Sequence, residues 1–203
     1  MEDDDNFNEN KVIFLGDTNV GKTSLIRIST GRKIDSGMKP TVTTSFTSKR
    51  FSYNKKDYVF NLWDTIGQEK YRALVRIFFK NAIILVLVYD ITNKNSFNTL
   101  NYWHEQIKNE LMNDSYILAV VGNKKDLYQN EEISEEEAQK FADGINAKFT
   151  ISSAKEEPLV FIEFLEELFI DYIKKIYNKK PNLPRNLSLK KKDIIKKNKK
   201  KCC

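Results

Sequence analysis

A glycine-containing segment near the beginning of the chain has the residue types and spacing of a phosphate-binding loop. Residues 16–23 read Gly-Asp-Thr-Asn-Val-Gly-Lys-Thr and match the pattern G-x-x-x-x-G-K-[ST]. Glycines let successive backbone N–H groups face phosphate oxygens, and the N-terminus of the following helix adds its dipole. Lys22 is then expected to contact the β- and γ-phosphates, and the Thr23 hydroxyl to bind Mg²⁺. The segment predicts a nucleoside triphosphate ligand without identifying its base.

A second segment predicts which base is bound. Residues 123–126 read Asn-Lys-Lys-Asp and directly follow an apolar run that ends at Val121-Gly122. The carboxylate of Asp126 can accept hydrogen bonds from N1–H and N2–H₂ of guanine, whereas adenine offers no such pair of donors. Residues 152–155, Ser-Ser-Ala-Lys, follow a later strand-like run and are expected to present a backbone N–H to the guanine O6. The combination favours GTP over ATP.

A third segment, Asp64-Thr65-Ile66-Gly67-Gln68, lies between these two and has the residues needed for hydrolysis. An Asp at the end of a strand can hold Mg²⁺ through water, and a Gly permits close approach to a γ-phosphate. Gln68 is expected to orient the attacking water.

The apolar periodicity predicts the elements that carry these segments. Strands are expected at 11–15, 46–53, 58–63, 82–89, 116–121 and 148–151, and helices at 22–30, 70–80, 96–113, 134–142 and 159–177. Ser134 and Glu137 form a capping-box pattern, and a hairpin turn is expected at 54–56. Alternating strands and helices predict an α/β fold with a six-stranded, mostly parallel sheet, one antiparallel edge strand and helices on both faces.

Composition and charge divide the 203 residues into three parts. An acidic extension is predicted at 1–9, a nucleotide-binding domain at 10–178 and a flexible polybasic tail at 179–203. The tail holds eleven Lys or Arg and one Asp, a charge of +10, so residues 1–178 carry −4 of the net +6. This balance argues against nucleic-acid binding by the folded part. A hydrophobic content of 40% excludes global disorder, and the longest apolar run, eight residues at 82–89, is too short for a membrane span.

The tail ends in the adjacent pair Cys202-Cys203. Neighbouring Cα atoms are about 3.8 Å apart, closer than ordinary disulfides allow, so lipidation is the predicted use of these cysteines.

Taken together, the chain resembles the Rab branch of the Ras superfamily of small GTPases, over residues 10–177 and at the C-terminus. Besides the segments above, the resemblance rests on Leu62-Trp63-Asp64-Thr65, Glu69-Lys70-Tyr71-Arg72, Phe78-Phe79-Lys80-Asn81-Ala82, Val88-Tyr89-Asp90-Ile91-Thr92, Asn95-Ser96-Phe97 and the terminal Cys-Cys. It implies the P-loop small-GTPase fold and an enzyme that converts GTP to GDP and phosphate with Mg²⁺. Switch I is expected at about 34–46 and switch II at about 64–80.

The resemblance also assigns expected roles to single residues. Thr41, after Pro40, matches the switch I Thr that completes the Mg²⁺ shell, and Gln68, Lys22 and Thr41 are the expected catalytic residues. The expected metal ligands are Thr23, Thr41 and Asp64. The residues expected to contact the nucleotide are Asp17, Thr18, Asn19, Val20, Gly21, Lys22, Thr23, Ser24, Ile34, Pro40, Thr41, Asp64, Gly67, Asn123, Lys124, Asp126, Leu127, Ser153, Ala154 and Lys155.

Partners and location follow from the same resemblance. Effectors are expected to read Phe46, Trp63 and Phe78, although plain core packing is the alternative for these aromatic residues. A nucleotide exchange factor, a GTPase-activating protein, a GDP-dissociation inhibitor, the Rab escort protein and geranylgeranyl transferase are the other expected partners. Geranylgeranyl groups on Cys202 and Cys203 imply anchoring to the cytoplasmic face of an intracellular membrane, cycling with the cytosol and a role in vesicle-mediated transport, with no nucleic-acid partner.

Several positions depart from the family pattern. Ile66 replaces an Ala, Thr43 a Gly and Ser45 an acid, Ile34 replaces the aromatic residue beside guanine, and Thr18 occupies a position where side chains slow hydrolysis. We therefore expect slow GTP hydrolysis and fast nucleotide release. Three alternatives stay open: a GTP-holding scaffold with little hydrolysis, a P-loop ATP enzyme such as a kinase, and a nucleic-acid binder acting through its tail.

Overall fold

The computed structural model describes residues 10–35, 37–67, 76–111 and 116–179. Its six strands are β1 (Lys11–Leu15), β2 (Ser45–Tyr53), β3 (Lys56–Asp64), β4 (Ala82–Asp90), β5 (Ile117–Asn123) and β6 (Lys148–Ile151). They form one sheet in the order β2-β3-β1-β4-β5-β6. Only β2 and β3 pair antiparallel, and all the other neighbours pair parallel. The predicted α/β class and the antiparallel edge strand are confirmed.

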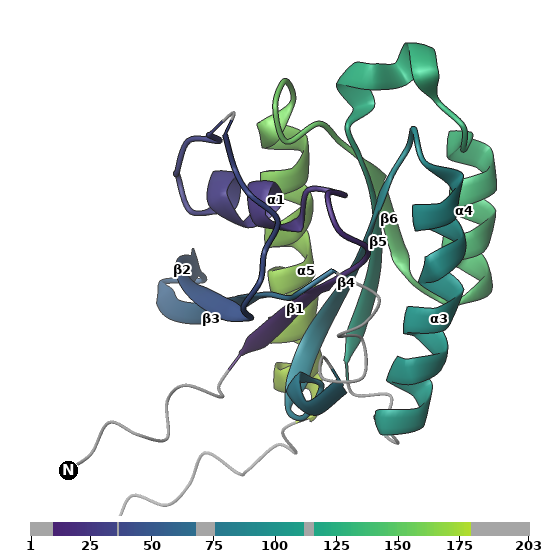
Figure 1. Cartoon of the computed structure of the whole chain (residues 1–203). Helices are drawn as coiled ribbons and strands as arrows, with labels where there is room; N and C mark the ends of the chain where they lie inside the picture. The colour runs from purple at the N-terminus through teal and green to yellow at the C-terminus, as the bar shows by residue number, and fades with distance from the viewer. Residues whose placement is uncertain (1–9, 36, 68–75, 112–115, 180–203) are drawn as a thin grey trace, which may run out of the picture.

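Helices cover both faces of this sheet (Figure 1). The α-helices are α1 (Lys22–Ser29), α3 (Lys94–Glu110), α4 (Glu135–Gly144) and α5 (Pro158–Lys179), and short 3-10 helices are η3 (Arg76–Phe78) and η4 (Lys125–Asn130). Helices α1 and α5 lie on one side of the sheet, and α3 and α4 lie on the other.

Alternating strand residues feed two separate cores. Val12 and Phe14 of β1 belong to the cluster beneath α1 and α5, whereas Ile13 and Leu15 belong to the cluster beneath α3 and α4. All four side chains are fully buried. A central parallel strand requires apolar residues on both of its faces. This pattern fixes the register of β1 in the sheet and therefore the position at which the following loop begins.

Local signals explain the turn and one helix start. Asn54 and Lys55 both have positive φ, 51° and 61°, which is the conformation of a type I′ hairpin turn and joins β2 to β3. Ser134 accepts a hydrogen bond from the backbone N–H of Glu137 at 3.2 Å, so the predicted cap of α4 is present.

The helix predicted at 70–80 is wrong in its described part. Residues 76–78 form one 3-10 turn and no α-helix, and residues 70–75 lie outside the described residues. The side chain of Phe79 is fully buried, and its carbonyl accepts from the backbone N–H of Ala82 at 2.9 Å. With Asn81 at φ 63°, the chain turns there directly into β4, which leaves no room for another helical turn.

Candidate nucleotide-binding site

The phosphate-binding loop connects β1 to α1 in a conformation that depends on its glycines. Gly16 and Gly21 have φ values of +145° and +98°, which L side chains rarely adopt. A Cβ atom at Gly16 would collide with the carbonyl oxygen of Val88, and one at Gly21 would collide with the side-chain amide of Asn123. The loop is therefore pressed against β4 and β5, at the carboxyl ends of parallel strands.

Lys22 is buried at the first position of α1. Its Nζ donates hydrogen bonds to the carbonyl oxygens of Gly16 at 2.9 Å and Asp17 at 2.8 Å. Burial lowers its pKa to about 8, against the opposing attraction of Asp64 and Asp17. A buried cation held at the mouth of a loop attracts an anion strongly, because little water screens it.

The three predicted metal ligands meet at one point. Thr23 Oγ1 lies 2.7 Å from Asp64 Oδ2 and 2.8 Å from Thr41 Oγ1, and Thr41 Oγ1 lies 3.4 Å from the same carboxylate oxygen. Each hydroxyl carries one proton, so the shortest arrangement has Thr41 donating to Thr23 and Thr23 donating to Asp64. Three elements, α1, the segment before β2 and the end of β3, thus contribute to one oxygen cluster.

This cluster fits a hard divalent cation. Asp64 Oδ1 is buried and has no hydrogen-bond partner among the described residues, and burial raises the pKa of this carboxyl group. Hydroxyl and carboxylate oxygens are the ligands that Mg²⁺ prefers, and Mg²⁺ is typically held by one or two carboxylates together with phosphates. The described residues contain no group of three or more His, Cys, Asp or Glu side chains that could bind a metal, so a cation here would depend on the hydroxyl groups and on phosphate as well.

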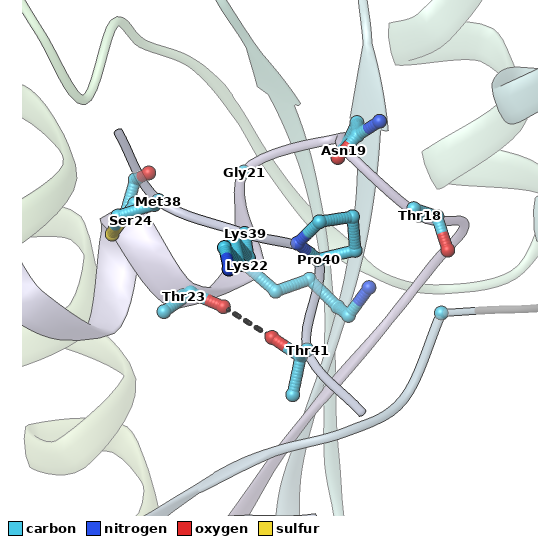
Figure 2. Close-up of a pocket in the computed structure, with 11 residues that line it drawn as sticks. Thr18, Asn19, Gly21, Lys22, Thr23, Ser24, Met38, Lys39, Pro40 and Thr41 are labelled. Carbon is cyan, nitrogen blue, oxygen red and sulfur yellow. Dashed lines mark hydrogen bonds between the residues drawn. The ribbon is translucent and has the colours of Figure 1, made fainter. Parts of the chain in front are cut away.

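A cavity of about 130 Å³ adjoins this cluster (Figure 2). It is lined by Thr18, Asn19, Gly21, Lys22, Thr23, Ser24, Met38, Lys39, Pro40, Thr41 and Gly67. Nine of these residues were predicted to contact the nucleotide, and Met38 and Lys39 were not. Figure 2 shows residues 38–41 passing across the first turn of α1, so that the cavity lies between this segment and the phosphate-binding loop.

The predicted base-binding residues form a second set of contacts, centred on Asn123. Its Nδ2 donates to the carbonyl of Val20 at 2.8 Å, and its Oδ1 accepts from the backbone N–H of Ala154 at 3.1 Å. The Ser153 hydroxyl donates to Asp126 Oδ1 at 2.6 Å. These bonds join the phosphate-binding loop, the end of β5 and the loop after β6.

The remaining residues of this end are more open. Lys124 has a left-handed backbone, φ 69°, and its Nζ forms an ion pair with Asp90 at 2.6 Å. Leu127 and Lys155 are exposed. Ile34 is half-buried against the core cluster beneath α1 and α5 and does not line the described cavity, so its predicted contact with guanine stays a prediction.

Gly67 lies directly on the phosphate-binding loop. A Cβ there would be 2.5 Å from the carbonyl carbon of Asp17 and from the backbone nitrogen of Thr18, so this position excludes every larger residue. Ile66 beside it is half-buried. Gln68, Cys202 and Cys203 lie outside the described residues.

The predicted effector residues form one continuous aromatic group. The rings of Phe46 and Trp63 stack with centroids 5.1 Å apart, and those of Trp63 and Phe78 are 5.5 Å apart. Lys11 Nζ lies over Trp63 at 4.4 Å and over Phe78 at 5.8 Å, and burial lowers its pKa. Phe46 is 37% exposed, so this group is partly a surface and not only core packing.

Sequence reasoning missed contacts that cross between elements. The Thr99 hydroxyl on α3 donates to Asp17 Oδ2 at 2.9 Å, across 82 positions of sequence. Neither Thr99 nor Lys11 belongs to a local motif. Lys39 precedes Pro40-Thr41 directly, and this adjacency is the one signal that could have found it.

The fold and the phosphate-binding loop define a nucleoside-triphosphate-binding protein of the P-loop type. Comparison with known proteins narrows this class. The model of the Ras family matches residues 11–178. Ras-related protein Rab-22A of Homo sapiens is 35% identical over 176 residues, which cover 87% of this chain and 88% of the relative. Ras-related protein Rab-21 of Geodia cydonium is 36% identical over 171 residues, covering 84% and 72%.

A more distant relative, Ras-related protein RabJ of Dictyostelium discoideum, is 32% identical over 174 residues, covering 86% of this chain and 66% of the relative. The chain therefore belongs to the Ras family and is a small GTPase of the Rab group. Across the described residues, none of the helices combines the length and the apolar character that a membrane span needs.

Proposed function

We propose that this chain is a switch of membrane traffic that binds GTP with Mg²⁺ and hydrolyses it slowly to GDP. The convergence of Thr23, Thr41 and Asp64 beside the buried Lys22 carries this proposal. When bound, Mg²⁺ supplies positive charge that offsets the phosphates. Thr23 and Asp64 would hold it, with Thr41 as the ligand that reports which nucleotide is present.

The oxygen cluster links the site to an exposed surface. Thr41 is held by Thr23, and the segment that follows it runs into β2, where Phe46 stacks on Trp63. Loss of the Thr41 contact after hydrolysis would free this segment and change the aromatic group. Effectors that read Phe46, Trp63 and Phe78 would then distinguish the two nucleotide states.

Hydrolysis is proposed to be slow. Gln68 would orient the attacking water, while Thr18 lines the cavity and Ile66 lies next to the Gly67 that touches the phosphate-binding loop. These side chains would crowd the place where the water must align. Intrinsic rates of such enzymes without an activating protein correspond to minutes or hours per turnover.

Single-turnover hydrolysis of bound GTP tests this role. Gln68→Leu should lower the rate at least about tenfold and leave GDP affinity nearly unchanged. Gln139→Leu, the same change at an exposed position of α4, is the matched control and should behave as wild type. A wild-type protein that binds GTP without any turnover would instead favour the scaffold alternative, and equal rates for both variants would remove Gln68 from the mechanism.

The location and the partners are proposed from the family and the tail. Residues 10–178 would be the GTPase domain, flanked by the acidic extension 1–9 and the polybasic tail 179–203. Geranylgeranyl groups on Cys202 and Cys203, added through the Rab escort protein and geranylgeranyl transferase, would anchor it at the cytoplasmic face of an intracellular membrane. A GDP-dissociation inhibitor would return it to the cytosol, and an exchange factor and a GTPase-activating protein would set its state.

Sedimentation of the full-length protein with membranes tests the anchor. One lipid chain binds membranes only marginally, and two chains, or one chain with a polybasic segment, give stable binding. Changing both cysteines to Ser should leave the protein in the supernatant, while each single change should give weaker, salt-sensitive binding. A double variant that still sediments at high salt would contradict lipid anchoring.

A further inference from the structure

The cavity between the phosphate-binding loop and residues 38–41 is lined by a lysine that none of the family motifs contains. Of the eleven described residues that line it, Lys22 and Lys39 are cationic and none is acidic. Lys22 comes from α1, and Lys39 comes from the segment that precedes Thr41 (Figure 2). A polyanion bound in this cavity would be attracted by both lysines.

The position of Lys39 is tied to that of Thr41. Only Pro40 separates them, and its ring fixes φ near −65°, which makes this stretch of backbone stiff. Thr41 Oγ1 is held 2.8 Å from Thr23 Oγ1. Lys39 therefore lines the cavity in the conformation in which Thr41 is docked on Thr23, and the undocking of Thr41 would carry Lys39 away as well.

From this arrangement we propose that Lys39 is a second phosphate-binding cation, which contributes only when Thr41 is docked and therefore favours the triphosphate over the diphosphate. The inference rests on the proposed function. Lys22 holds its place through two carbonyl groups of the phosphate-binding loop, so it serves both nucleotides. Lys39 is exposed and depends on the switch segment, so its contribution is specific to one state.

Nucleotide affinities of the full-length protein with Mg²⁺ test the proposal. Lys39→Gln should weaken binding of the slowly hydrolysed analogue GTPγS by about three- to tenfold, the range of a charge-assisted hydrogen bond on a partly exposed group. Its GDP affinity should change by less than about twofold, and Lys39→Arg should retain the wild-type ratio. Raising KCl from about 50 to about 500 mM should reduce the difference in GTPγS affinity between wild type and Lys39→Gln, because salt screens an exposed charge.

Lys33→Gln is the matched control. Lys33 is an exposed lysine of the same connection that does not line the cavity, so neither affinity should change beyond about twofold. The proposal is overturned if Lys39→Gln affects GDP and GTPγS equally, affects neither, or is reproduced by Lys33→Gln. A wild-type protein without affinity for guanine nucleotides would refute the proposed function itself, which is a separate result.

Discussion

The base end of the site is held by hydrogen bonds within the protein, whereas at the phosphate end burial disfavours the charged forms of a lysine and a carboxyl group. Asn123 is satisfied at 2.8 Å and 3.1 Å by two backbone groups, and Asp126 accepts from Ser153 at 2.6 Å. At the other end Asp64 Oδ1 is buried without a partner among the described residues, and burial lowers the pKa of Lys22.

This difference indicates how the two ends divide their work. A base end whose residues are already held in place without ligand would offer the same surface to GDP and GTP, because both carry the same guanine. A phosphate end whose charged groups are destabilised by burial depends on what binds there, so it would respond to one phosphate group and to pH. Changes at the base end should thus affect both nucleotides equally, and changes at the phosphate end should separate them.

The largest effect is expected for Asp126→Asn. The variant amide oxygen can still accept from Ser153, so the loop should keep its structure, while the two hydrogen bonds from guanine to a charged acceptor are lost. We expect a loss of about 3–4 kcal/mol in GDP and GTP affinity alike, measured by calorimetry. Xanthine nucleotides should bind the variant better than guanine nucleotides do.

The exposed Asp143→Asn on α4 is the control for that change. Wild-type protein that binds ADP as tightly as GDP would show that Asp126 does not select the base.

A smaller effect, on stability as well as affinity, is expected for Asn123→Ala. This substitution leaves the carbonyl of Val20 and the N–H of Ala154 without their partner, and both residues are buried. An unsatisfied buried group costs about 1–3 kcal/mol, so we expect a loss of about 2–3 kcal/mol in the free energy of unfolding of the nucleotide-free protein. Urea titration measures it.

Asn130→Ala, an exposed change in η4, should stay within about 0.5 kcal/mol of wild type. Equal stability of the two variants would mean that the base end is not held by Asn123.

The phosphate end should respond to pH through Lys22. Its pKa in the nucleotide-free protein is about 8, against an ordinary value of 10.5, and bound phosphates favour the charged form. Above pH 8 binding therefore takes up a proton, and GDP affinity should fall by up to about tenfold per pH unit. Fluorescent-nucleotide titrations at a series of pH values measure the slope.

Stability of the nucleotide-free protein should move the other way over the same range. The unfolded chain binds more protons than the folded one between pH 8 and 10.5, so the free energy of unfolding rises with pH there. Lys22→Arg keeps its charge throughout and should remove the pH dependence of affinity. A wild-type affinity that stays constant to pH 9 would contradict this account of the phosphate end.

Sequence patterns predicted the parts of the molecule that depend on local physics. The alternating apolar residues of β1, the hairpin at Asn54-Lys55 and the loop 16–23 each follow from neighbouring residues, and each has its expected form. The prediction of a helix at 70–80 was wrong in its described part, because the burial of Phe79 is a tertiary contact that overrides the helical periodicity.

Contacts between distant elements could not be predicted in the same way. Thr99 reaches Asp17 across 82 positions, and Lys11 lies over Trp63 only because β1 and β3 are neighbours in the sheet. Sequence motifs identify the residues that are expected to touch a ligand. The residues that support them come from other helices and strands, and the packing of those elements produces no pattern in the local sequence.

The smallest effect is expected at one of these supporting residues, Thr99. Its hydroxyl lies 2.9 Å from both Asp17 Oδ2 and the Asn95 carbonyl, so a single proton serves two acceptors and the contact to Asp17 is partial. Asp17 provides a carbonyl to Lys22 and the peptide on which Gly67 rests. Thr99→Val should therefore weaken GTPγS binding by about two- to fivefold, with less change for GDP.

Thr99→Ser keeps the hydroxyl and separates anchoring from packing. It should restore the wild-type ratio of GTPγS to GDP affinity, even though it removes a methyl group from α3. If the Ser variant changes that ratio and the Val variant does not, the methyl group and not the hydrogen bond to Asp17 supports the loop. In that case packing, and not a hydrogen bond, would hold the phosphate-binding loop, which would sharpen the contrast with the hydrogen-bonded base end.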